Sequence, residues 1–146
     1  MREILFRGFH PCDGPDTIVV DGEKVKGRWV KGSLLTYKDG TTFVCCEDYI
    51  PDVLNKYEVL PSTVGQYTGL KDKNGKRIFE GDRISHRWAD WDHHPTQQIV
   101  RWENNSCGFE PFSDSEENYY HYGGGLAPDD CEVIGTVFDE EAPNET

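Results

Sequence analysis

The chain has 146 residues, of which 36% are hydrophobic and 12% aromatic. This length suits one domain or two small lobes, and no apolar run approaches the roughly 18 residues of a membrane span. All 15 Lys and Arg residues precede Trp102, whereas 12 of the 27 acidic residues follow Arg101, so the net charge of −12 arises in the last third. Such a field disfavours nucleic acid and favours basic protein partners.

The N-terminal sequence MREILFRGF is too charged to form the apolar core of a secretory signal, so we expect a cytoplasmic protein without a membrane anchor. Five cysteines occur, an odd number, and no two have CxxC spacing. These features favour reduced thiols over a disulfide framework.

Short runs rich in β-branched and aromatic residues alternate with turn residues, and this rhythm indicates a mainly β protein. Asp21-Gly22, Asp39-Gly40 and Asn74-Gly75 are predicted to form hairpin tips. Asn74-Gly75 suits a type I′ turn, because Asn tolerates positive φ and Gly adopts it without steric cost.

We predict two lobes and a tail. The proposed division is an N-terminal β lobe (1–63), a C-terminal barrel-like, SH3-like β lobe (64–138) with an acidic loop at 113–128, and an acidic tail (139–146). The last predicted strand is Glu132–Phe138, and we expect its apolar residues to close the core, namely Val133, Ile134, Val137 and Phe138.

The segment Gln66–Arg83 combines the Asn74-Gly75 hairpin with a Gly81-Asp82 corner. A Gly followed by Asp at the start of a strand indicates a bent backbone. The Asp carboxylate can accept hydrogen bonds from the free amides of that bend. Turn chemistry explains this composition, so we interpret the segment as scaffold.

Two groups of residues suggest chemistry. His93-His94 lies beside Asp90 and Asp92, residue types that bind divalent metals. Neighbours on an extended chain point in opposite directions, so we predict neither a metal site nor a cofactor there. The basic segments Lys24–Lys31 and Lys71–Arg77 could contact nucleic acid. Alternating charged and apolar residues, however, more often indicate a strand with one solvent-exposed face.

Several of these runs together resemble the YopX-like proteins of phages and prophages. The similarity is densest at Val64–Leu70 and Ile78–Asp82 and returns at Glu132–Val137. The resemblance implies a small, mainly β phage or prophage protein with a barrel-like half after VGQYTGL, and it brings no catalytic or ligand residue.

Our preferred hypothesis is a non-enzymatic accessory protein that binds another protein. This hypothesis is compatible with a homo-oligomer. The candidate contact residues are Glu116, Glu117, Asp129 and Asp130, all predicted to be exposed. One alternative is a nucleic-acid-associated protein that uses the two basic segments, provided that they form one surface away from residues 102–146. A second alternative is a metal-dependent enzyme at His93 and His94.

Overall fold

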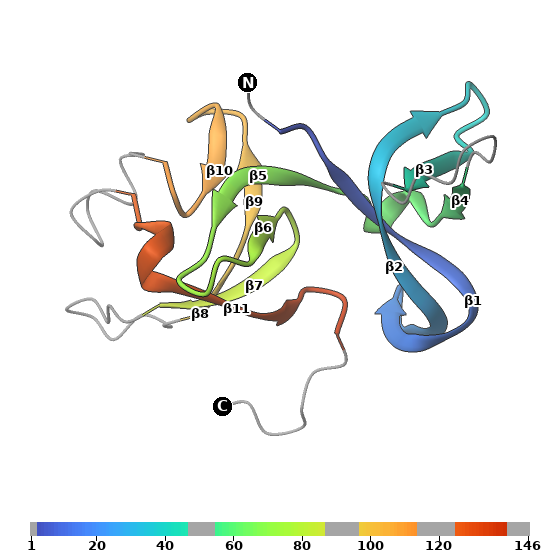
Figure 1. Cartoon of the computed structure of the whole chain (residues 1–146), viewed down its shortest axis with the longest axis horizontal. Helices are drawn as coiled ribbons and strands as arrows, with labels where there is room; N and C mark the ends of the chain where they lie inside the picture. The colour runs from blue at the N-terminus through green and yellow to red at the C-terminus, as the bar shows by residue number, and fades with distance from the viewer. Residues whose placement is uncertain (1–2, 47–54, 87–96, 114–124, 140–146) are drawn as a thin grey trace. The chain divides into compact units, whose positions relative to one another are not determined.

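The computed structural model describes residues 3–46, 55–86, 97–113 and 125–139 (Figure 1). They form eleven β-strands and two single-turn 3-10 helices, so the mainly β prediction is confirmed. The chain divides into two compact units, Met1–Gln66 with Phe138–Thr146, and Tyr67–Val137. The division falls within strand β5 (Gly65–Lys71), three residues beyond the boundary expected from the sequence.

The first unit is an antiparallel meander that continues into the start of β5. Its elements are β1 (Phe6–Val20), β2 (Glu23–Thr36), β3 (Thr42–Cys46), β4 (Lys56–Val59) and the 3-10 turn η1 (Pro61–Thr63). The strand order is β4-β3-β2-β1-β5, because the first residues of β5 pair with the start of β1. Val30, Val44 and Val59, from three of these strands, form a buried cluster on one face of the sheet.

The second unit holds the rest of β5 and the remaining strands. They are β6 (Arg77–Phe79), β7 (Asp82–His86), β8 (Gln97–Ile99), β9 (Arg101–Glu103), β10 (Gly108–Glu110) and β11 (Cys131–Thr136), the last preceded by the 3-10 turn η2 (Pro128–Asp130). β7 pairs with both β11 and β8, whereas β9 and β10 form a separate ribbon. None of the sheets formed by the described residues closes into a barrel, so the barrel-like, SH3-like form expected for this half is not seen in them.

All three predicted dipeptides lie at hairpin tips. Asp21-Gly22 joins β1 to β2 with φ values of 51° and 81°, as a two-residue type I′ turn requires. The loops at Asp39-Gly40 and Asn74-Gly75 have a different hydrogen-bond pattern. The Gly40 amide donates to the Tyr37 carbonyl and the Gly75 amide to the Asp72 carbonyl, each at 3.0 Å. In both loops the glycine alone has positive φ, +93° and +80°.

The type I′ prediction for Asn74-Gly75 was therefore wrong. Three residues, Lys73 to Gly75, connect Asp72 to Lys76, and the loop is closed by a bond from the Asp72 amide to the Lys76 carbonyl at 2.8 Å. Three-residue connections of this kind combine a type I turn with a glycine bulge. The Asp72 side chain favours this form, because it accepts hydrogen bonds from two amides inside the loop.

The core of the second unit differs from the expectation for its last strand. It contains the buried residues Ile78, Ile84, Val100, Leu126 and Cys131. Ile134 and Val137 are instead 45% exposed. The register between β11 and β7 shifts between Val133 and Gly135, and this bulge leaves Ile134 without a partner opposite it on β7.

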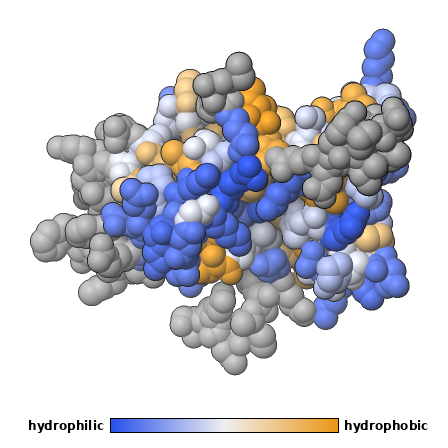
Figure 2. Space-filling model, viewed as in Figure 1, coloured by the Kyte–Doolittle hydropathy of each residue, from blue (hydrophilic) through white to orange (hydrophobic). Residues whose placement is uncertain are grey.

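Polar residues predominate on the face seen in Figure 2, and apolar residues appear there in scattered patches. The described residues include no helix with the length and apolar character needed to cross a bilayer.

Candidate partner-binding site

A buried carboxylate fixes the loop between β5 and β6 against β11. Asp72 is only 4% exposed, and it accepts hydrogen bonds from the amides of Asn74, Lys76 and Val133, each at 2.9 Å. Burial raises the pKa of Asp72, but the three N–H donors and the charge of Lys76 outweigh burial and leave this pKa below its ordinary value. These bonds thus fix the loop to the start of β11.

This anchoring places Lys73 beside the first residues of β11. The Lys73 amide donates to the Cys131 carbonyl at 3.0 Å, and its Nζ lies 3.4 Å from Glu132 Oε2. Asn74 Nδ2 donates to the other oxygen of Glu132, also at 3.4 Å. The loop therefore covers polar groups at the start of β11, and the Lys73 charge is offset by a neighbouring carboxylate.

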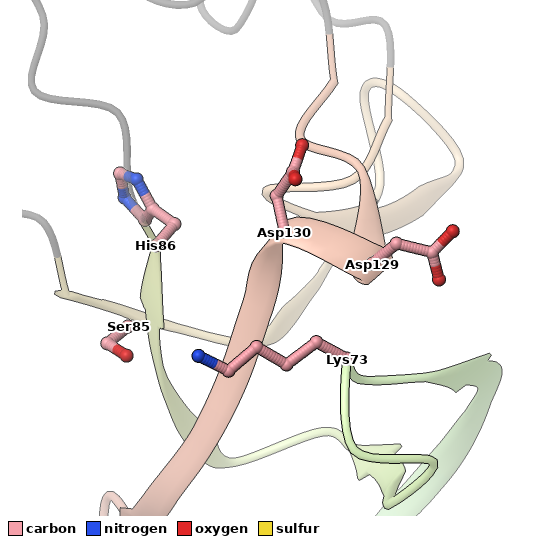
Figure 3. A pocket seen from close by; sticks show the side chains of 5 residues that line it. All are labelled: Lys73, Ser85, His86, Asp129 and Asp130. Carbon is pink, nitrogen blue, oxygen red and sulfur yellow. The ribbon is translucent and has the colours of Figure 1, made fainter.

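An open cleft of about 400 Å³ lies next to this contact (Figure 3). Its lining residues are Lys73 from the β5–β6 loop, Ser85 and His86 from β7, and Asp129 and Asp130 from η2. Ser85 and His86 leave opposite faces of the strand, as neighbours on β7 must. Asp130 points to the same side as His86, whereas Asp129 points away from that side chain.

The described lining of the cleft combines an amine, a hydroxyl, an imidazole and two carboxylates. The Lys73 side chain extends toward Ser85 in Figure 3, and the described residues contain no group of three metal-ligating side chains. Lys73 Nζ forms an ion pair with Glu132 across 3.4 Å at the edge of the cleft. Asp129 and Asp130 place two carboxylates at the rim of the cleft.

The structure brings only part of the predicted site together. Asp129 is exposed, whereas Asp130 is half-buried. Glu116 and Glu117 lie outside the described residues. Sequence reasoning missed His86 as a lining residue, because no local pattern connects it with η2 more than forty residues later.

The two histidines proposed for a metal-dependent enzyme, His93 and His94, also lie outside the described residues. None of the five cysteines, all of which are described, forms a disulfide. Burial, followed by the charges of Asp130 and Asp72, raises the pKa of Cys131 to about 11. Cys131 therefore stays protonated at neutral pH and serves as a small apolar core residue.

The two basic segments belong to different units, Lys24–Lys31 to the first and Lys71–Arg77 to the second. Within the second unit Lys73 contacts Glu132 and shares a cleft with Asp129 and Asp130. This cation thus lies among the acidic residues of the last third, not on a separate basic surface. The nucleic-acid role of the two basic segments stays a prediction.

The fold is that of a small protein made of antiparallel sheets. The chain matches the family described as YopX protein over residues 19–142, which is most of its length. It therefore belongs to the YopX family. No curated protein matches the chain.

Proposed function

We propose that this protein is a non-enzymatic accessory protein of a phage or prophage and that it acts by binding another protein. The carrying observation is that η2 presents Asp129 and Asp130 at the rim of a cleft in the second unit. Lys73 is the one cation among the described lining residues, and Glu132 already offsets its charge. The cleft therefore suits a Lys or Arg side chain of a basic partner.

The sequence around the cleft extends this acidic surface. No Lys or Arg follows Arg101, so every charged residue supplied by the last third is acidic. Glu116 and Glu117 belong to that third, and we include them in the proposed contact surface. A surface of one sign accelerates encounter with an oppositely charged partner and selects against partners of its own sign.

A pull-down from induced host cells with two matched variants tests this proposal. Asp129→Asn/Asp130→Asn removes two charges at the cleft with little change in shape. Glu23→Gln/Glu58→Gln removes two exposed charges from the first unit and is the control. We expect a basic host or phage protein to bind wild type and the control and to be lost from the Asp129/Asp130 variant.

Equal capture by all three proteins would contradict a role for the cleft, and equal loss from both variants would indicate attraction by net charge alone. Circular dichroism of each variant shows whether the fold is retained. Metal analysis of the purified protein addresses the alternative at His93 and His94, because a stoichiometric bound metal would favour an enzyme.

A further inference from the structure

The strand β2 has one edge that β3 covers only in part. β3 pairs with β2 from Gly32 to Thr36, whereas β1 pairs with β2 as far back as Glu23. The segment Gly27–Val30 therefore has a ladder partner on its β1 side, and no described strand pairs with its other side, which we call the open edge. The backbone N–H and C=O groups at such an edge can pair with a further strand.

The direction of the Phe9 main chain shows which groups of β2 face the open edge. Phe9 lies opposite Trp29, but its N–H donates to Thr63 Oγ1 at 2.9 Å and its C=O accepts the Leu60 amide at 3.0 Å. Both groups thus point away from β2, so Phe9 and Trp29 form a non-hydrogen-bonded pair of the antiparallel ladder. In such a pair the Trp29 N–H and C=O point away from β1, toward the open edge.

These two Trp29 groups lie at a cleft of about 370 Å³ whose lining includes residues 28–31 in succession. No described residue hydrogen-bonds to them. Side chains alternate between the faces of a strand, so a cleft lined by four consecutive residues runs along the edge of the strand. The lining also includes Cys46, the last residue of β3, whose amide donates to the Asn55 carbonyl at 2.8 Å. The cleft therefore lies where β3 ends and leaves room beside Trp29.

The side chains at the open edge favour negative charge. Arg28 lines the cleft, and its guanidinium carbon lies 4.7 Å from the centroid of the Tyr57 ring, which the His10 ring meets edge-on at 5.1 Å. Lys26 is exposed and leaves the same face of β2 as Arg28. Its ion pair with Asp13 is solvent-exposed on both sides, and such pairs are weak. None of the described lining residues carries a carboxylate.

We propose that the open edge binds an extended, acidic segment of another protein, which adds as a strand beside Trp29. The added chain exchanges two main-chain hydrogen bonds with Trp29 and brings carboxylates to Arg28 and Lys26. In strand addition the main-chain bonds provide affinity, and the alternate side chains provide specificity. This site is in the first unit and does not depend on the proposed acidic surface of the second.

Amide hydrogen exchange with synthetic peptides tests the inference. The test peptide is a capped hexapeptide of alternating Glu and Val, and its control has Lys in place of Glu. In the free protein the Trp29 N–H should exchange faster than the Arg28 N–H, which faces β1 in a hydrogen-bonded pair with His10. The acidic peptide at saturation should slow exchange at Trp29 about tenfold or more and leave Arg28 unchanged. The basic peptide should change neither rate.

N-methylated peptides locate the main-chain bonds. When the glutamates lie beside Arg28, the valines lie opposite Trp29, and their N–H groups face it. An acidic peptide with N-methylated valines should therefore not bind. A peptide with N-methylated glutamates should still bind, because these N–H groups point away from β2. Equal binding of the two methylated peptides would refute strand addition.

Two protein variants test the charge preference. Arg28→Gln should bind the acidic peptide about tenfold more weakly, whereas Lys38→Gln, which removes an exposed cation outside the cleft, should bind as wild type does. Equal weakening in both variants, or equal affinity of wild type for the acidic and basic peptides, would overturn the inference. Slow exchange of the Trp29 N–H in the free protein would also overturn it. If that protection disappears on dilution, the edge joins two copies of the chain instead.

Discussion

Replacing Asp72 by its amide should destabilise the second unit, because three backbone amides donate to this buried carboxylate. Asp72→Asn keeps the shape of the side chain, but an NH2 group replaces one carboxylate oxygen. This group cannot accept a hydrogen bond from the backbone N–H that faced that oxygen. At least one of the three bonds, to Asn74, Lys76 or Val133, is then lost. A hydrogen bond to a charged group contributes roughly 1.5–3 kcal/mol, so we expect a cost of about 2 kcal/mol.

Thermal and urea unfolding at neutral pH measure this cost, which corresponds to a fall in melting temperature of roughly 4–8 °C for a chain of this size. Asp39→Asn is the matched control, because Asp39 sits in the equivalent loop but is exposed and bonds only within it, to the Thr41 amide. Amide exchange adds a local test: the Val133 N–H should exchange faster in Asp72→Asn. Equal melting temperatures of the two variants, with unchanged exchange at Val133, would refute the anchoring role.

The effect should also depend on pH. The pKa of Asp72 is lower in the folded protein than its ordinary value of about 3.9. The stability that its ionised form provides is therefore complete above about pH 4 and is lost as pH falls through the folded pKa. The difference between wild type and Asp72→Asn should shrink over that acidic range, and a constant difference down to the lowest pH tested would contradict this assignment.

Two further predictions concern a backbone position and a thiol. Gly75→Val should lower stability by roughly 1–3 kcal/mol, because φ at this position is +80°, and Gly75→Asn should be milder; equal urea midpoints for the two variants would contradict this. Cys131 should react with a thiol reagent at mildly alkaline pH only after unfolding, since it is buried with a pKa of about 11. The exposed Cys12 and Cys107 should label first, and labelling of all three at one rate would refute the assignment.

Features of the fold that depend on neighbouring residues were predictable from the sequence. Asp21-Gly22 forms the two-residue turn that its composition indicates. The Gly81-Asp82 corner is also confirmed, because Gly81 has a φ of 91° and the Asp82 carboxylate accepts the Phe79 amide at 2.7 Å. In both places the partners lie within a few residues, so local chemistry decides the conformation.

Features that depend on distant segments were not predictable. The Asp72 carboxylate accepts the amide of Val133, which lies 61 residues further along the chain. The outward position of Ile134 follows from a bulge in the pairing of β11 with β7, and its sequence resembles that of a regular strand. The cleft beside η2 is likewise assembled from three separate segments, and only Asp129 and Asp130 were anticipated.

The association rate of the protein with its captured partner, measured against salt, tests the central claim most directly. The proteins compared are wild type and a variant in which Glu116, Glu117, Asp129 and Asp130 are neutralised together. We predict that the wild-type rate falls between about 50 mM and about 500 mM salt, and that the variant associates slowly with little salt dependence. A rate that is equal in both proteins and independent of salt would contradict an acidic binding surface.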